Sequence, residues 1–470
     1  MKTDYLRALR DGEPLSFNQR VQLILKLSGP AILAQISSIV MQYIDASMVG
    51  RLGANDSASI GLVSSSTWVI GGIMISLVEG FSVQMAHSIG AKDNKRARNL
   101  MKTGVIIDML IALLLMALVM SISFYLPGWL GGAEEIRHNA TLYLLVYGAF
   151  IPVFMINYIT CAMIQASGNM KIPSICDTLM FILDMIFNFI FIFPTATYNI
   201  LGLKLKIYGA GLGVAGAALG TGVSYVVVTA FLIYYMFAKS DILHLRKDEK
   251  LKIQLADIKK AFKISLPLAC ERGITSGASV AVTRIIAPLG SISVAANSFA
   301  VTAEALCYMP GYGVQSAATT IIGQSIGAGR KDQTKKLGYI AIGTGVIIMT
   351  LTGILMYFLA PIMIGILTPD PAIKALGVTV LRIEAFAEPF FAVSIVASGV
   401  FRGAGDTLAP SLMCLFSLWC VRVPLSIMLV KPLGLRGVWI AMATELTVRG
   451  IIFLVRLIRG KWENKLYARN

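Results

Sequence analysis

Long apolar stretches alternate along this chain with short segments that are rich in charged residues, glycine or proline. The stretches 140–170, 207–238 and 337–369 each contain no Lys, Arg, Asp or Glu. The hydrocarbon core of a bilayer is about 30 Å thick, and about 20 helical residues cross it. Each of these stretches is therefore long enough to span a membrane.

Twelve segments of this kind can be delimited between charged or Gly/Pro-rich breaks. The pattern therefore predicts an all-α polytopic membrane protein with about twelve transmembrane helices. The predicted spans are 27–50, 59–83, 103–126, 141–165, 172–194, 208–238, 264–288, 294–326, 338–366, 376–401, 408–431 and 435–458.

The composition agrees with this pattern. Of the 470 residues, 56% are hydrophobic and 14% are charged, against about 25% charged in an ordinary soluble domain. The net charge is +16, but a nucleic-acid-binding protein would need a solvated basic face. A mean hydropathy of +0.74 leaves little room for such a face, so we expect no nucleic-acid partner.

The basic residues also predict an orientation. Most of the 41 Lys and Arg fall in the N-terminal segment, in alternate loops and in the C-terminal segment. Because Lys and Arg accumulate on the cytoplasmic side of membrane proteins, we expect both termini to be cytoplasmic. The predicted location is the cell (inner) membrane.

The sequence also repeats itself. A shift of 237 residues pairs Pro30 with Pro267, and it aligns Ser88-Ile89-Gly90-Ala91 with Ser325-Ile326-Gly327-Ala328. The register changes only after the fifth span. Two homologous six-helix halves must have the same orientation, related by a pseudo-two-fold axis along the membrane normal, as in some secondary transporters. We predict an N-terminal bundle at 1–238, a cytoplasmic linker at 239–263 and a C-terminal bundle at 264–470.

Local motifs narrow the choice among such transporters. Three of them are Asp45-Ala46-Ser47-Met48-Val49-Gly50-Arg51-Leu52-Gly53, Gly323-Gln324-Ser325-Ile326-Gly327-Ala328-Gly329 and Phe401-Arg402-Gly403-Ala404-Gly405-Asp406-Thr407. In order and spacing the chain resembles the MATE (multidrug and toxic compound extrusion) family of the MOP superfamily, from about residue 20 to 460. Thr275 and Phe391 stand where the NorM-like branch often has acids, so the acidic residues resemble the DinF-like bacterial branch more closely.

The resemblance implies a secondary active antiporter and not an enzyme. Such proteins export amphipathic or cationic compounds in exchange for sodium ions or protons, by alternating access. No cofactor is implied, and the expected partners are small-molecule substrates, the coupling ion and membrane lipid, with the protein as a monomer. Two alternatives remain: a lipid-linked oligosaccharide flippase of the same superfamily, and a transporter of the major facilitator type.

Polar residues on the first span form a stripe. Gln35, Ser38, Gln42 and Asp45 follow one another at steps of three, four and three residues, which places them on one helix face. Ionisable groups are costly within a membrane and are usually functional there. Asp45 is thus a candidate ion-coupling residue at the end of a polar face.

A second polar pair lies on the fifth span, where Asp184 and Asn188 are four residues apart and share a face. The 237-residue shift places apolar residues opposite Asp45, Asp184 and Asn188, so this set belongs to the first half alone. The family resemblance implies that these three and Thr221 form a cation site. Many relatives have the amide before the acid, whereas here Asp184 comes first.

The sequence leaves the ion open. Carboxylate, amide and hydroxyl oxygens suit a hard cation such as sodium, and a carboxylate removed from water also takes up a proton readily. A transported sodium ion at Asp45 and Asp184 is the one metal that we expect.

The second half carries acids of its own. Glu271, Glu304 and Glu388 are candidate cavity acids. Glu271 precedes Arg272, and this pair is interpreted either as a structural ion pair or as part of transport. Glu445 and Arg449 are four residues apart, so we expect them to pair locally.

Overall fold

The computed structural model describes residues 5–200, 203–246, 249–460 and 462 of the chain and consists mainly of long helices. The elements in chain order are α1 (Tyr5–Asp11), α2 (Phe17–Gly50), α3 (Ala54–Gly90), α4 (Asn94–Ile122), α5 (Leu126–Trp129), α6 (Glu134–Ala166), α7 (Lys171–Ile192), β1 (Pro194–Ile200), β2 (Leu203–Ala210), α8 (Gly213–Tyr234), η1 (Tyr235–Lys239), α9 (Leu255–Ile286), η2 (Ala287–Leu289), α10 (Ser291–Gly327), α11 (Lys331–Leu367), α12 (Pro371–Ala385), α13 (Glu388–Gly403), α14 (Leu408–Ser417), η3 (Leu418–Arg422), α15 (Val423–Leu433) and α16 (Leu435–Arg459).

Polar caps start several of these helices. At α2, the Ser16 hydroxyl accepts from the Gln19 backbone N–H at 3.3 Å while the Gln19 side chain accepts from the Ser16 N–H at 2.8 Å. This reciprocal capping box satisfies two N–H groups that lack partners within the helix. Asp93 caps α4 and Asp370 caps α12 in a similar way.

The structure confirms a multi-pass membrane protein. Within the described residues, ten helices are long and apolar enough to cross a membrane. The other two predicted spans correspond to α9, which carries Glu271 and Arg272 in its middle, and to the pair α12 and α13. Helix α9 begins at Leu255, so it extends into the segment 239–263 that was predicted as a linker.

The tenth predicted span, 376–401, was wrong as a continuous helix. Helix α12 ends at Ala385, and α13 starts at Glu388 with Pro389 in its first turn. Proline has no N–H to donate to the preceding turn, which explains why a new helix starts here. The eleventh span is also irregular, because the π-helical segment η3 separates α14 from α15.

The sixth predicted span, 208–238, was placed to start too early in the sequence. Strands β1 and β2 form an antiparallel hairpin that extends to Ala210, and α8 begins only at Gly213. Residues 203–207 alternate apolar and basic residues with a period of two, which is typical of a strand. The inserted hairpin explains why the repeat loses its register in this region.

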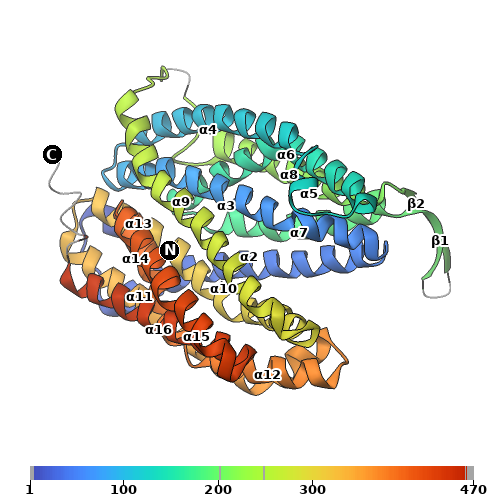
Figure 1. The fold of residues 1–470 in the computed structure, drawn as a ribbon. Coiled ribbons are helices and arrows are strands. Elements are labelled where there is room, and N and C mark those ends of the chain that lie inside the picture. The colour runs from blue at the N-terminus through green and yellow to red at the C-terminus, as the bar shows by residue number, and fades with distance from the viewer. Residues whose placement is uncertain (1–4, 201–202, 247–248, 461, 463–470) are drawn as a thin grey trace.

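Two groups of helices lie side by side in Figure 1, the first half in blue to green and the second in yellow to red. The hairpin projects from one end, here called the hairpin end. The segment 240–254 and the ends of α3, α6, α10 and α13 lie at the opposite end, called the linker end.

The two halves share a large contact surface. Helix α2 lies against α7 of its own half and α10 of the other, while α3 lies against α6 and α9. Leu23, Ile24 and Leu27 at the start of α2 pack into a buried apolar cluster with residues of α10, α11 and α13. Helix α2, which carries Asp45, therefore connects both halves.

Candidate ion-coupling site

Three of the predicted site residues lie together in the structure. The Asn188 side-chain amide donates to Asp45 Oδ1 at 2.9 Å and to Asp184 Oδ2 at 2.8 Å. Asp45 comes from α2, whereas Asp184 and Asn188 come from one face of α7. One amide thus bridges two carboxylates on neighbouring helices.

Small residues on α8 bring this helix close to the site. A Cβ added at Gly216 would collide with the Phe191 carbonyl, and one at Gly220 would collide with Asn188 Oδ1. Because glycine has no Cβ, α8 can pack directly against α7 at these two positions. Thr221, which follows Gly220, lies beside Asp184 and is the fourth member of the predicted site.

The site has more acceptors than donors. Asp184 and Asn188 are each 1% exposed, and among the described residues neither Asp184 Oδ1 nor Asn188 Oδ1 has a hydrogen-bond partner. Buried polar atoms are normally paired, and unpaired ones call for an explanation. An unpaired oxygen of the Asp184 carboxylate and the unpaired Asn188 carbonyl, with the Asp45 carboxylate close by, form a suitable environment for a small cation or a proton.

The polar stripe on α2 is less enclosed than this site. Gln35 is half-buried, and Ser38 and Gln42 are exposed on the protein surface. The buried serines on this helix are instead Ser28 and Ser37, and the Ser37 hydroxyl lies 3.4 Å from the Thr178 hydroxyl on α7. The structure therefore brings Asp45 to Asp184 and Asn188 of α7 and leaves Ser38 and Gln42 at the surface.

A second group of acids is buried in the other half. Glu304 on α10, Glu384 on α12 and Glu388 on α13 are 6%, 0% and 0% exposed. Within the described residues, none of the four carboxylate oxygens of Glu384 and Glu388 has a hydrogen-bond partner. Glu384, which was not among the predicted site residues, lies in the last turn of α12, and Glu388 is the first residue of α13.

The remaining acids have identifiable neighbours. Glu271 accepts a hydrogen bond from the Ser411 hydroxyl at 2.5 Å. The expected pairing of Glu445 with Arg449 is confirmed, with two hydrogen bonds of 2.8 and 2.7 Å. Local spacing was sufficient to predict this pair.

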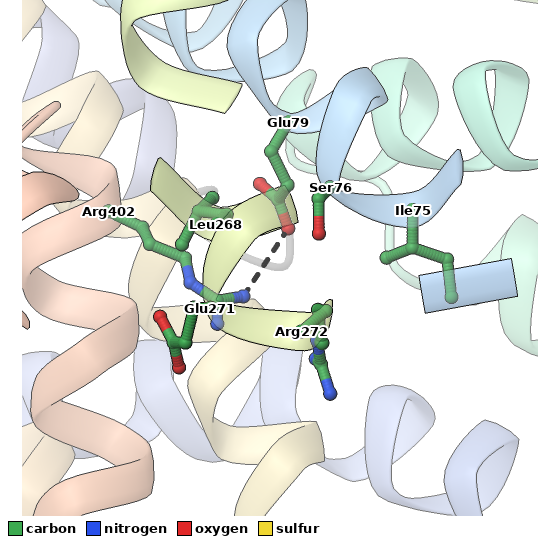
Figure 2. A pocket seen from close by; sticks show the side chains of 7 residues that line it. All are labelled: Ile75, Ser76, Glu79, Leu268, Glu271, Arg272 and Arg402. Atoms are coloured by element: carbon green, nitrogen blue, oxygen red, sulfur yellow. Dashed lines mark ion pairs between the residues drawn. The ribbon is translucent and has the colours of Figure 1, made fainter. Parts of the chain in front are cut away.

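An ion pair that the sequence did not suggest joins the two halves. Arg402 Nη1 on α13 lies 3.7 Å from Glu79 Oε1 on α3 (Figure 2). These residues are distant in the sequence, and no spacing rule relates them. They line a small cavity together with Glu271 and Arg272.

With this geometry established, comparison with known proteins gives the family. The MatE family model matches residues 30–190 and again residues 267–428. The chain belongs to the MATE family. The two matches begin 237 residues apart, at 30 and 267, which is the shift of the internal repeat.

Relatives match over nearly their whole length. A probable multidrug resistance protein NorM of Thermotoga maritima is 26% identical over 94% of this chain and 93% of its own. A second, from Mannheimia succiniciproducens, is 25% identical over 93% of each. The expectation that the acids are closer to the DinF-like branch stays a prediction.

Solved structures agree with the fold. A crystal structure of MATE in complex with MaL6 superposes with a TM-score of 0.88 at 22% identity, covering 99% of this chain and all of its own. An outward-facing conformation of a multidrug resistance MATE family transporter of the MOP superfamily gives the same score and identity, with full coverage of both chains. This MATE protein is thus a multi-pass membrane transporter and not an enzyme.

Proposed function

We propose that this MATE protein is an antiporter that exports amphipathic, often cationic, compounds in exchange for sodium ions or protons. The relatives that match nearly the whole chain are named as probable multidrug resistance proteins. The observation that carries the coupling proposal is the amide of Asn188 between two carboxylates, with Asp184 Oδ1 and Asn188 Oδ1 buried and unpaired among the described residues. Such a site offers hard oxygen donors to a small cation.

The four residues would take different roles with each ion. A sodium ion would be held by the carboxylates of Asp45 and Asp184, the Asn188 carbonyl oxygen and the Thr221 hydroxyl, all of which are hard oxygen donors. A proton would be shared between the two carboxylates, because both lie against the same Asn188 amide and two negative charges so close together repel each other. In both cases ion binding draws α2, α7 and α8 together.

Helix α2 can pass this movement to the other half. The Tyr43 hydroxyl, two residues before Asp45, donates to the Thr302 carbonyl of α10 at 2.9 Å. An ion that shifts α2 toward α7 therefore acts on a contact with α10. Alternating access needs a link of this kind between an ion site and the interface of the halves.

The second-half acids are proposed to act on the substrate. Glu271, Glu304 and Glu388 would add negative charge to the cavity wall and so favour cationic compounds. We further propose that the protein is a monomer in the bacterial inner membrane with both termini cytoplasmic, so that the linker end faces the cytoplasm. The bundles would comprise residues 1–238 and 264–470.

Efflux in proteoliposomes tests the coupling proposal. A fluorescent cation such as ethidium is loaded, and sodium and proton gradients are imposed in separate experiments on wild type and Asp45→Asn. We expect one gradient to drive efflux in wild type and neither to do so in the variant. Wild-type rates in Asp45→Asn would refute the role of this carboxylate.

A further inference from the structure

The contacts that close the linker end occur twice, once in each direction. His87 Nε2 on α3 donates to the Gly403 carbonyl on α13 at 2.7 Å. The Gln324 amide on α10 donates to the Ala166 carbonyl on α6, also at 2.7 Å. His87 and Gln324 are 237 residues apart, as are Ala166 and Gly403. The interface thus follows the two-fold symmetry of the repeat.

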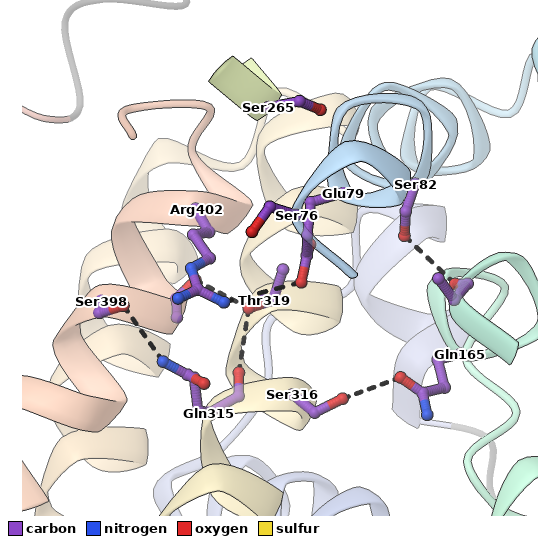
Figure 3. Close-up of polar contacts among 12 residues, drawn as sticks. Ser76, Glu79, Ser82, Gln165, Ser265, Gln315, Ser316, Thr319, Ser398 and Arg402 are labelled. Carbon is purple, nitrogen blue, oxygen red and sulfur yellow. Dashed lines mark hydrogen bonds and ion pairs between the residues drawn. The ribbon is translucent and has the colours of Figure 1, made fainter. Parts of the chain in front are cut away.

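The same symmetry relates two further contacts between these helices, and these two are chemically different (Figure 3). The Ser316 hydroxyl donates to Gln165 Oε1 at 3.0 Å. The 237-residue shift converts Ser316 to Glu79 and Gln165 to Arg402, and these two form the 3.7 Å ion pair. A neutral hydrogen bond is sufficient to join the halves at this level. The charges at the second position therefore call for another explanation.

The charges are unequally divided between the halves. Glu79 is the one charged residue that α3 contributes to the small cavity, while Glu271, Arg272 and Arg402 all belong to the second half. Figure 2 shows the Arg402 guanidinium between the carboxylates of Glu79 and Glu271. If the halves separate at the linker end, Arg402 keeps an acidic neighbour from its own half. Glu79 would lose Arg402, the one cation with which it forms an ion pair among the described residues.

The ion pair is long and partly exposed. Its closest N–O distance is 3.7 Å, and the Glu79 and Arg402 side chains are 23% and 13% exposed. A carboxylate left without a partner inside a membrane protein is costly, whereas one paired with a cation is much less so. A cation that binds Glu79 only after Arg402 has moved away would favour the open linker end, because it binds the two states unequally.

We propose that Glu79 is a substrate-loading site, where the cationic group of an amphipathic substrate replaces Arg402 as the linker end opens. This rests on the proposed export of cationic compounds and adds a binding residue to it. The ligand is a hydrophobic cation, such as an aromatic quaternary ammonium. Ile75 and Leu268, which line the same cavity, would contact its apolar part.

Ethidium counterflow in proteoliposomes tests the proposal without any ion gradient. For Glu79→Gln we expect the KM for ethidium to rise by about tenfold, the loss of roughly one charge contact, with the maximal rate much less affected. Glu79→Asp keeps the charge and should stay near the wild-type KM. Ser316→Ala, which breaks the symmetry-related hydrogen bond, is the matched control and should also leave the KM near wild type.

A double variant keeps the test valid if Glu79→Gln folds poorly. Glu79→Ser with Arg402→Gln copies the neutral pair Ser316 and Gln165, which this fold already accommodates. Its KM for ethidium should rise as in Glu79→Gln. Wild-type KM values in both neutral variants, or an equal rise in Glu79→Asp, would overturn the proposal. Because counterflow needs no ion gradient, these outcomes are independent of whether Asp45 couples transport.

Discussion

The linker-end interface and the proposed ion-coupling site follow opposite rules. Contacts at the linker end recur in both halves, with His87 and Gln324 in equivalent roles. The site around Asp45 and Asp184 exists in the first half alone, and its equivalents in the second half are Val282 and Val421. Both halves need the same packing to close one end of the bundle. If the proposed ion site is needed only once, the second copy was free to diverge.

The largest expected effect concerns the unrepeated site. Replacing Asp184 by Asn removes a buried carboxylate and keeps its shape, so we expect gradient-driven efflux to fall by on the order of 100-fold. The measurement is ethidium efflux in proteoliposomes under the effective gradient. Glu388→Gln, in the other half, should keep coupling to the same ion. Equal loss of coupling in both variants would show that the first half is not special.

The repeated contacts make a strong prediction at the glycines. A Cβ at Gly327 would collide with the His87 carbonyl, and one at Gly90 would collide with the Gln324 carbonyl. Gly327→Ala should therefore destabilise the protein by roughly 1–3 kcal/mol. Thermal unfolding in detergent measures this. Gly343→Ala in α11 has open space around it and should be neutral or stabilising, so an equal loss there would contradict the packing argument.

The hydrogen bonds donated by His87 and Gln324 should contribute similarly to the free energy of unfolding if the repeat symmetry governs the linker end. His87→Ala and Gln324→Ala each leave a buried carbonyl without its donor, which typically costs about 1–3 kcal/mol. We expect the two variants to lower the melting temperature by similar amounts. A large effect of one and none of the other would show that the second contact is a remnant of duplication.

A smaller effect is expected where the linker is anchored. Arg98 donates to both carboxylate oxygens of Glu249, at 2.8 and 2.5 Å, and this contact holds the pKa of Glu249 below its ordinary value. Its stabilising contribution is present at neutral pH and is lost as the pH falls below the usual glutamate range. Glu249→Gln should lower the melting temperature at pH 7 and much less at pH 3. The exposed Glu13→Gln is the control, and a pH-independent effect of Glu249→Gln would contradict the pairing.

Much of the fold could be predicted from apolar runs, because a membrane span requires a long uncharged helix. The convergence of Asp184 and Asn188 could be predicted from helical spacing, and that of Asp45 from the family resemblance. The Glu79–Arg402 pair could not. Its contact depends on the crossing of α3 with the second half, which no local pattern encodes. The hairpin was missed because its alternating pattern lies beside a long apolar run.

The most direct test of the central claim is ion binding to the purified protein. Sodium-22 binding and substrate-induced proton release can be measured on wild type, Asp45→Asn and Glu388→Gln in the same detergent. If Asp45 is the coupling carboxylate, wild type and Glu388→Gln should each show one saturable ion site, and Asp45→Asn should have lost it. Undiminished ion binding in Asp45→Asn together with loss in Glu388→Gln would place the coupling site in the second half.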